Sequence, residues 1–396
     1  MTRIGFAYNQ KPGEEGALPQ AAAETPHSDE EPPSKRRDIP SRNSDSPAAP
    51  IPAHAGADPA TPPLDEHAEW DTPETIDAVA AALSQLGDVI RLEADHDFPA
   101  RLRAERPDIV FNIAEGLTGM NRESRVPAIC EFFSVPYSGS DPFTLSLCLH
   151  KARTKEVLSY NRIPTAAFAL VRSPHEIAFL RARLDFPLFA KPVHEGSSKG
   201  ITERSFCRDA GELEEQVTFL LERYDEPVLV EQFLPGAEFT CAVLGNGPAA
   251  RVLPIVEMDF ETLPAGALPI YGFEAKWLWD SRDRPLEIFR CPARVNASLR
   301  QSIESTALRA YDVLGCRDWA RVDIRLDAHG TPNIVEVNPL PGILPDAKDN
   351  SCLPKAARAA GIGYDALIQS CLMMAAERQG VPLPELPAGA RRVAAG

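Results

Sequence analysis

Long hydrophobic runs are absent from this 396-residue sequence. No stretch approaches the about 18–20 apolar residues that a membrane-spanning helix needs, so a membrane protein is excluded and no membrane is expected as a partner. The opening residues, MTRIGFAYNQKPGEEG, contain no apolar core followed by a small-residue cleavage site, and no signal peptide is predicted. We therefore expect a cytoplasmic protein.

Closely spaced cysteine pairs are also absent. The eight cysteines are scattered along the chain, and none forms a CxxC pair. This spacing excludes the common zinc motifs and provides no disulfide framework. We interpret the cysteines as reduced thiols that pack as small hydrophobic side chains.

Positive charge is in deficit. The 41 lysines and arginines stand against 57 aspartates and glutamates, which gives a formal net charge of -16. Such a chain repels nucleic acid, so nucleic acid is not expected as a partner. The hydrophobic content of 44% and charged content of 25% are those of an ordinary globular protein. At about 100–200 residues per domain, the length allows two to four domains.

One segment has almost no large apolar residues. Residues 11–67 consist mainly of proline, alanine, glutamate, aspartate and serine. Such a composition cannot bury enough surface to offset the entropy of ordering the chain, so this segment is predicted to be disordered. We interpret its Lys35-Arg36-Arg37 cluster as solvated charge. The last residues, 383–396, are predicted to form a flexible tail.

Strands and helices alternate on either side of this segment. Thr72 is predicted to cap a helix that begins at Pro73, and Gly87 is predicted to end it. The alternation is typical of βαβ units and a parallel sheet. The insertion then follows the first strand, at the edge where open α/β sheets bind ligands. The predicted strands lie at 4–8, 89–92 and 109–112, with a further helix around 101–105.

A turn of small residues follows a predicted strand at 189–192. Its sequence, EGSSKG at 195–200, leaves backbone N–H groups room to surround a phosphate, and a lysine can neutralise the charge. The turn does not match GxxxxGK[ST], so a Walker-type NTPase is not predicted. The apolar run at 228–234 carries Glu231, which is either a solvated group or a ligand for ribose hydroxyls.

A β-hairpin is predicted over residues 321–338, with a four-residue turn at 327–330. Asp323 then lies diagonally from Glu336, with a Cα separation of about 7–8 Å. Asn338 ends the same row, and together these oxygen ligands suit Mg²⁺. The alternative is a charged solvent-exposed face. The predicted face comprises Arg321, Asp323, Arg325, Ile334 and Glu336.

Four segments, in this order, resemble the ATP-grasp ligases, and most closely the D-alanine–D-alanine ligase family: KPVHEGSSKG, VLVEQFLPGAEFT, RVDIRLDAHG and IVEVNPLPG. The similarity runs from about Trp70 to about Leu372. The resemblance implies an α/β protein with an N-terminal Rossmann-like domain and an ATP-grasp fold, which is α+β in the ATP-binding half. It implies an enzyme of cell-wall biogenesis in which ATP converts a carboxylate to an acyl phosphate and an amine attacks to form a peptide bond.

The resemblance also implies an organisation and a set of partners. The expected domains are an N-terminal domain at 1–146, a central ATP-grasp subdomain at 147–232 and a C-terminal subdomain with the metal site at 233–382. The co-substrate is ATP, the cofactor is two Mg²⁺ ions with Mn²⁺ as the alternative, and the other substrates are small amino acids. Members of the family are commonly dimers, so a homodimer is expected.

Roles for single residues follow from the same resemblance. Asp323, Glu336 and Asn338 match the metal ligands. Arg321, Ser197 and the backbone of Gly342 match the catalytic groups. The second substrate's carboxylate is matched to Ser351, and Glu69 and Glu115 are further candidates for substrate contacts. The matched ATP contacts are Lys151, Lys191, Ser197, Ser198, Glu231, Phe233, Leu234, Glu238 and Lys276.

The amino-acid half departs from the family pattern. The glutamate that usually holds the first amino group is not recognisable, and the candidates are Glu14, Glu15, Glu69 and Asp71. Residues 112–124 read NIAEGLTGMNRES where the family carries His-Gly and Gly-Glu-Asp-Gly. The loop lysine is followed by Trp277, where the family has a tyrosine. Separately, the isolated histidines His150, His194 and His329 are predicted to be surface or loop residues.

These departures leave alternatives open. Because the ATP half is intact, a ligase is expected, and its substrates are either D-alanine or a different amino acid or hydroxy acid in a specialised pathway. A nucleotide-binding protein without ligase chemistry is the alternative from another class.

Overall fold

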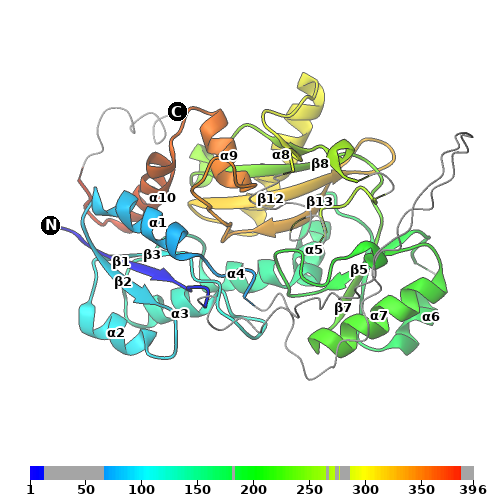
Figure 1. The fold of residues 1–396 in the computed structure, drawn as a ribbon, viewed down its shortest axis with the longest axis horizontal. Coiled ribbons are helices and arrows are strands. Elements are labelled where there is room, and N and C mark those ends of the chain that lie inside the picture. The colour runs from blue at the N-terminus through cyan, green and yellow to red at the C-terminus, as the bar shows by residue number, and fades with distance from the viewer. Residues whose placement is uncertain (13–66, 181–182, 265–266, 273–275, 277–285, 385–396) are drawn as a thin grey trace, which may run out of the picture. The chain divides into compact units, whose positions relative to one another are not determined.

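The computed structural model describes residues 1–12, 67–180, 183–264, 267–272, 276 and 286–384. The body of the 11–67 insertion, the candidates Glu14 and Glu15, Trp277 and most of the predicted tail lie outside these residues. Figure 1 shows three β-sheets, each with its own helices. One sheet falls within each of the three predicted segments, while the boundaries between the segments remain a prediction.

The N-terminal sheet is parallel, with the strand order β2-β1-β3, as the alternation of strands and helices predicts. Helix α1 packs on one face of β1 through Ile4 and Phe6, and α2 packs on the other face near Ala7. The strands are β1 (Arg3–Tyr8), β2 (Asp88–Glu93) and β3 (Ile109–Asn112), and the helices are α1 (Pro73–Ser84), α2 (Phe98–Glu105) and α3 (Arg125–Phe132).

The start of α1 is as predicted, but its end is not. Thr72 is extended and its hydroxyl accepts a hydrogen bond from the Thr75 N–H, with Pro73 in the first turn. The helix ends at Ser84, three residues before Gly87, so Gly87 does not cap it. A Cβ at Gly87 would lie 2.3 Å from the carbonyl oxygen of Thr2. Glycine is therefore needed here because two backbone segments pass each other closely.

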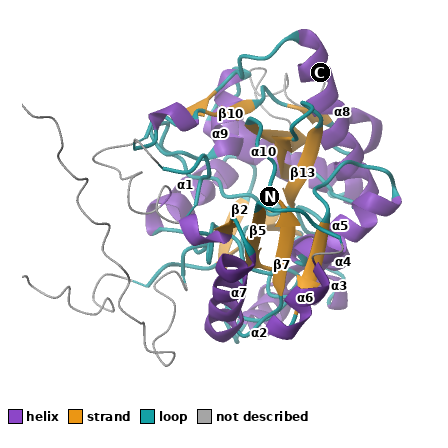
Figure 2. Cartoon of the chain, turned by 90° about the vertical axis from the view of Figure 1, so that its right-hand side faces the viewer, coloured by secondary structure: helices purple, strands orange, loops and turns teal. Residues whose placement is uncertain are grey.

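The second sheet is antiparallel, with the order β4-β7-β5-β6. Helix α7 covers it, as both Figure 1 and Figure 2 show. The predicted strands at 189–192 and 228–234 are confirmed, although the second ends at Gln232. The elements are α4 (Pro142–Leu149), α5 (Lys151–Tyr160), β4 (Phe168–Val171), α6 (Ile177–Leu180), β5 (Leu188–Pro192), β6 (Phe206–Cys207), α7 (Ala210–Tyr224) and β7 (Val228–Gln232).

The third sheet has the order β11-β10-β8-β12-β13, and β9 pairs with β8. Helix α8 packs on one face, and α9 and α10 pack on the other. The elements are β8 (Glu238–Leu244), β9 (Arg251–Val252), β10 (Val256–Met258), β11 (Phe289–Arg290), α8 (Ala297–Val313), β12 (Trp319–Leu326), β13 (Pro332–Asn338), α9 (Cys352–Ala359) and α10 (Tyr364–Gln379).

The predicted hairpin exists, but its register differs from the prediction. Asp323 pairs directly with Glu336, not diagonally, because a bulge leaves Val335 unpaired on β13. The turn has five residues, 327–331, between the two strands. The bulge turns the side chain of Ile334 into the core, where it is 1% exposed, so this residue does not share the polar face.

All eight cysteines are free thiols, as predicted. Among the residues that the structure describes, no single helix is long and apolar enough to cross a membrane. Helices α9 and α10 meet the length and composition criteria only as a pair that bends by 103°. Both helices contribute buried side chains to the core beneath the third sheet.

Candidate active site

A cavity of about 600 Å³ is bordered by the second and third sheets and by residues of the N-terminal segment that lie outside its sheet. Every predicted site residue that the structure describes lines this cavity, including those assigned to ATP, to the metal and to the amino acids. The structure therefore brings together residues as far apart in the chain as Glu69 and Ser351. Their individual roles remain predictions.

Two lysines share one buried carboxylate at the centre of the second sheet. Lys191 Nζ on β5 lies 2.7 Å from Glu231 Oε1, and Lys155 Nζ on α5 lies 2.8 Å from Glu231 Oε2. Burial raises the pKa of Glu231, but the two ammonium groups outweigh it and lower the pKa to about 2. Sequence reasoning missed Lys155, although it follows Lys151 by one helical turn and therefore faces the same way.

A third lysine joins the metal face to the small-residue turn. Lys151 Nζ lies 2.9 Å from Glu336 Oε1 and donates a hydrogen bond of 2.5 Å to the carbonyl oxygen of Glu195. Burial raises the pKa of Glu336, and the nearby cations, led by Lys151, bring it below the ordinary value. This carboxylate is therefore ionised and available to a cation at neutral pH.

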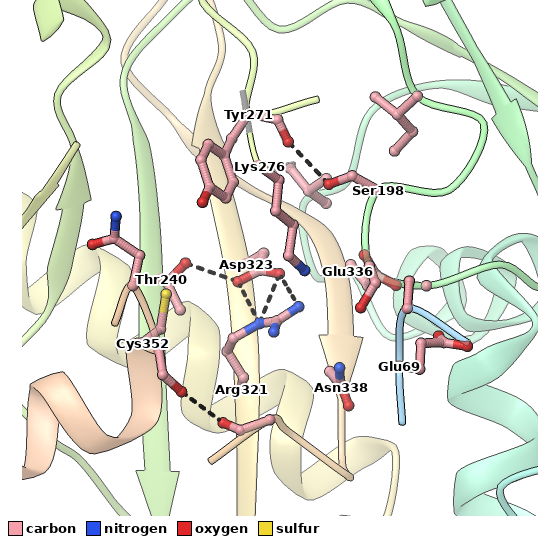
Figure 3. A pocket seen from close by; sticks show the side chains of 18 of the residues that line it. Glu69, Ser198, Thr240, Tyr271, Lys276, Arg321, Asp323, Glu336, Asn338 and Cys352 are labelled. Atoms are coloured by element: carbon pink, nitrogen blue, oxygen red, sulfur yellow. Dashed lines mark hydrogen bonds and ion pairs between the residues drawn. The ribbon is translucent and has the colours of Figure 1, made fainter. Parts of the chain in front are cut away.

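The predicted metal residues lie on adjacent strands (Figure 3). Asp323 Oδ1 accepts a 2.9 Å hydrogen bond from the Thr240 hydroxyl, and its Oδ2 lies 3.0 Å from Arg321 Nη2. Asn338 Oδ1 accepts a hydrogen bond from the N–H of Leu340. Two carboxylates and an amide oxygen form a hard donor set that fits a divalent cation such as Mg²⁺.

The small-residue turn has an unusual backbone. Ser197, Ser198 and Gly200 all have positive φ, at 50°, 62° and 70°. Successive backbone N–H groups in a turn can form an anion-binding concavity. The Ser198 hydroxyl donates to the carbonyl oxygen of Tyr271 at 3.0 Å, so the turn is tied to the segment that precedes Lys276.

Lys276 enters the cavity from the opposite side of the turn, and Figure 3 shows its side chain pointing toward Asp323 and Glu336. Burial lowers its pKa to about 8, and the Arg321 guanidinium adds to this effect. A phosphate beside this amine would favour the charged form.

Aromatic rings and an ion pair form the end of the cavity assigned to the nucleotide. Arg325 Nη1 lies 2.8 Å from Glu238 Oε2, and its guanidinium stands 5.0 Å above the Phe233 ring. Phe206 packs edge-on against Phe233, with ring centroids 4.7 Å apart. Burial raises the pKa of Glu238 even though Arg325 opposes the shift. These contacts hold Glu238 and Phe233 at the cavity wall.

Ser351 connects the two segments that close the cavity at the C-terminal side. Its hydroxyl donates to the carbonyl oxygen of Gly342 at 3.1 Å and accepts from the N–H of Leu344 at 3.2 Å. The Pro339–Gly342 turn is thereby fixed to the start of α9. This contact places Gly342 and Ser351 next to each other.

The sequence analysis did not predict a buried cluster of ion pairs around Glu69, at the part of the cavity that the N-terminal segment borders. Glu69 Oε2 lies 2.9 Å from both Arg122 Nη2 and Lys199 Nζ. A Cβ at Gly196 would lie 2.1 Å from Glu69 Oε1, so a larger residue there would push this carboxylate aside. Arg122 also donates to the carbonyl oxygen of His194 at 3.0 Å. No local pattern predicts this cluster, because its members are 53 and 130 residues from Glu69.

His150 and His194 lie in bends outside the helices and strands, as predicted, but they also contact each other. His194 is buried, its Nδ1 lies 2.8 Å from Glu226 Oε2, and its ring packs edge-on against His150 at 4.6 Å. His150 in turn accepts from the N–H of Arg153 at the start of α5. Isolation in sequence did not predict this contact, which forms through the tertiary fold. His329 is exposed at the hairpin turn, as predicted.

Known proteins share this sequence and fold. Residues 157–373 match the family model described as "D-ala D-ala ligase C-terminus". A D-alanine–D-alanine ligase of Bordetella parapertussis is 38% identical over 277 residues, which cover 70% of this chain and 81% of that protein. The protein y4sG of Sinorhizobium fredii is 32% identical over 318 residues, which cover 78% of this chain and 89% of that protein.

A solved structure gives the same fold. The crystal structure of the Bacillus anthracis D-alanine–D-alanine ligase complexed with ATP superposes with a TM-score of 0.63 at 20% identity, covering 96% of this chain and 99% of that one. The predicted α/β class and ATP-grasp fold are thus confirmed, and a protein without ligase chemistry is not favoured. The chain belongs to the D-alanine–D-alanine ligase family and is an ATP-dependent ligase that forms a carbon–nitrogen bond.

Proposed function

We propose that the cavity joins two small amino acids, with D-alanine as the reference substrate because relatives are named for it. The carboxylate of the first substrate attacks the γ-phosphate of ATP, ADP leaves, and the amine of the second substrate displaces phosphate from the acyl phosphate. The observation that carries this proposal is that lysines for phosphate, oxygen ligands for a metal and an arginine beside them all line one cavity.

The lysines and the small-residue turn are the proposed phosphate ligands. Lys151 and Lys191 neutralise phosphate charge, and the backbone of Ser197 and Ser198 donates N–H groups to phosphate oxygens. Lys276 covers the phosphates from the other side. Because these groups are fixed by buried contacts before ATP arrives, little reorganisation is needed when charge moves in the transition state.

The other end of ATP meets the aromatic end of the cavity. Phe233 and Leu234 border the proposed adenine site, and Glu231 and Glu238 are the proposed contacts to ribose and the adjoining nucleotide. The carboxylate of Glu231 is held between Lys155 and Lys191, so it also orients the lysine that meets phosphate.

Asp323, Glu336 and Asn338 would hold the divalent cations, proposed as two Mg²⁺ ions with Mn²⁺ as the alternative. The cation would offset negative charge on the transferring phosphoryl oxygens. Arg321 lies on the same face of the hairpin and is charged at any physiological pH. We assign it, with the backbone of Gly342, to the oxyanion that forms when the amine attacks.

Ser351 is assigned to the carboxylate of the second substrate, and Asp71 to the amino group of the first. Of the four candidates for this amino group, Glu69 is already paired with two cations. Burial raises the pKa of Asp71 to about 7, with only a partial opposing effect from Lys11. A substrate ammonium beside Asp71 would return it to the charged form, which is the behaviour expected of a binding group.

A homodimer and a cytoplasmic location complete the proposal. The homodimer is proposed because members of the family are commonly dimers. The cytoplasmic location is proposed because the eight free thiols suit a reducing compartment.

The test is ADP release with Mg²⁺ and a panel of single and paired amino acids in both enantiomers, with the products identified by mass. A dipeptide formed in step with ADP supports the proposal. ADP release without any condensed product, or no release with any member of the panel, would contradict it.

A further inference from the structure

Three carboxylates gather at one side of the cavity, two of them partly buried in its wall and the third buried behind it. Carboxylate oxygens of Glu69, Glu115 and Glu123 all lie within 4.8 Å of one another. Glu115 lines the cavity, and Glu123 is buried, with 6% of its surface exposed. Glu115 and Glu123 both belong to the 112–124 segment, in which the sequence departs from the family pattern.

The cations nearby do not balance this charge. Arg122 and Lys199 both bond to Glu69, and Lys199 also lies 2.9 Å from Glu195. Within the described part of the chain, Glu115 and Glu123 accept no hydrogen bond from a donor group. Burial and the neighbouring carboxylates raise the pKa of Glu115 well above its ordinary value, and burial raises that of Glu123 to about 7.

The backbone that carries Glu115 is held firmly. Gly116 donates its N–H to Asn9 Oδ1 at 2.8 Å, and its carbonyl oxygen accepts from Trp70 Nε1 at 2.9 Å. Gly116 has a φ of 71°, and a Cβ there would lie 2.9 Å from atoms of Arg122. These contacts fix the backbone next to Glu115, whose side chain lines the cavity.

Carboxylates that are buried together without counter-charges are unstable unless they gain protons or a cation. Asp71 at the same end of the cavity is the proposed partner of one ammonium group. Glu115, with Glu123 behind it, remains for a second one. A metal ion suits this position poorly, because the guanidinium of Arg122 is already among the carboxylates, 2.9 Å from Glu69.

We infer that the substrate bound at this end of the cavity is a diamino acid, and that Glu115 accepts a hydrogen bond from its side-chain ammonium. Glu123 is a positioning residue that adds negative charge behind Glu115. This inference rests on the proposed ligase function and names the substrate class of the same site. It also explains why the sequence keeps the ATP half of the family pattern while it changes residues 112–124.

The test compares each diamino acid with the neutral analogue that lacks only the side-chain amine: 2,3-diaminopropionate with alanine, ornithine with norvaline, and lysine with norleucine, in both enantiomers. The kcat/KM for ADP release, with products identified by mass, gives a ratio for each pair. We expect at least one diamino acid to exceed its analogue by about tenfold or more, which is the effect of one charge-assisted hydrogen bond.

The Glu115→Gln variant separates recognition from folding. It should lower this ratio by about tenfold or more. Its melting temperature should be unchanged or higher, because a repelling charge is removed. Glu123→Gln should cause a smaller loss of the same kind, and Glu222→Gln on the exposed side of α7 should cause none.

Neutral analogues that react as well as the diamino acids would overturn the inference and leave the ligase function intact. A ratio unchanged by Glu115→Gln would do the same. If nothing in the panel releases ADP, the proposed function fails, and binding still decides the inference through thermal shifts measured with ornithine and norvaline. Equal shifts with the two ligands, or shifts insensitive to Glu115→Gln, would overturn it.

Discussion

The ammonium of Lys151 contacts both sides of the proposed chemistry. It lies 2.9 Å from Glu336 Oε1 on the metal face and 2.5 Å from the carbonyl oxygen of Glu195 beside the small-residue turn. In the proposed mechanism, single side chains of this kind would set the position of ATP relative to the metal. Their substitution should therefore affect the rate more than the fold.

Glu336→Gln tests the metal assignment at this scale. The amide keeps the size of the side chain and an oxygen for Lys151 but loses the negative charge that a divalent cation needs. We expect kcat to fall by about 10²–10³-fold or more. The secondary structure seen by circular dichroism should remain. His329→Ala, at the exposed turn of the same hairpin, should keep wild-type kcat, and near wild-type kcat in Glu336→Gln would refute the assignment.

Asp71 should make stability depend on pH. Its pKa is 3.8 in an unfolded chain and about 7 in the folded protein, so the folded state holds the extra proton between these values. Its contribution to stability is complete below about pH 4 and is lost as the pH rises through 7. Asp71→Asn removes this contribution, so the melting temperature of the variant relative to wild type should rise from pH 5 to pH 8.

The same melting curves need a control at an exposed aspartate. Asp312→Asn on α8 should run parallel to wild type over this interval. A difference between Asp71→Asn and wild type that stays constant with pH would show that Asp71 does not titrate as described.

At the scale of elements, the small-residue turn is held from two sides. Ser198 bonds to the backbone of Tyr271, and Lys199 pairs with Glu69 from the segment that follows the insertion. The Glu69 pairs are buried, with side chains between 2% and 7% exposed. Removing one cation from such a cluster leaves buried negative charge that is only partly compensated.

Lys199→Met should therefore loosen the turn. We expect a loss of about 3–5 kcal/mol in the free energy of unfolding and a higher KM for ATP. The matched control is Arg208→Met, whose partner Glu212 is on the surface, and there the loss should stay below about 1 kcal/mol. Equal losses in the two variants, measured by urea unfolding, would contradict the importance of the Glu69 pair.

Local elements were predictable where the signal lies within a few residues. The strand at 109–112 and the cap at Thr72 follow from local hydrophobicity and turn chemistry, and both are confirmed. The bulge at Val335 was not predictable, because register depends on a five-residue turn and on packing of Ile334 into the core. Gly87 was misread because its role depends on Thr2, which is distant in the sequence.

In the site too, features that depend on neighbouring residues were predictable and features that depend on tertiary contacts were not. The lysines, the small-residue turn and the hairpin that carries Asp323 and Glu336 lie in short motifs, and all of them line the cavity. The contacts of Glu69 with Arg122 and Lys199 join three distant segments, and those of His194 with His150 join two. Tertiary contacts of this kind leave no periodic or local pattern in a single sequence.

At the scale of the whole molecule, the two ends of the insertion meet. The N–H of Lys11 donates to the carbonyl oxygen of Asp71 at 2.8 Å, and the N–H of Asp71 donates to that of Asn9 at 3.0 Å. These bonds hold the chain together on both sides of residues 13–66. The residues before and after the insertion are therefore joined by backbone hydrogen bonds that do not involve the insertion.

Replacing residues 13–63 by a short glycine–serine linker should preserve the fold and ATP binding. The expected change in melting temperature is small, since the bonds between Lys11, Asn9 and Asp71 are retained. ATP binding measured by calorimetry should stay within about threefold of wild type. A deletion variant that unfolds would show that the insertion is part of the core.

The central claim is that ATP activates a carboxylate in this cavity, and transfer of ¹⁸O tests it most directly. An amino-acid substrate labelled with ¹⁸O in its carboxylate is incubated with the enzyme, ATP and Mg²⁺, and the inorganic phosphate is analysed by mass. The account predicts one ¹⁸O atom in each phosphate released, because the acyl phosphate bridges the two groups through a carboxylate oxygen. Phosphate without ¹⁸O, released together with ADP, would show that water attacks ATP and would contradict the claim.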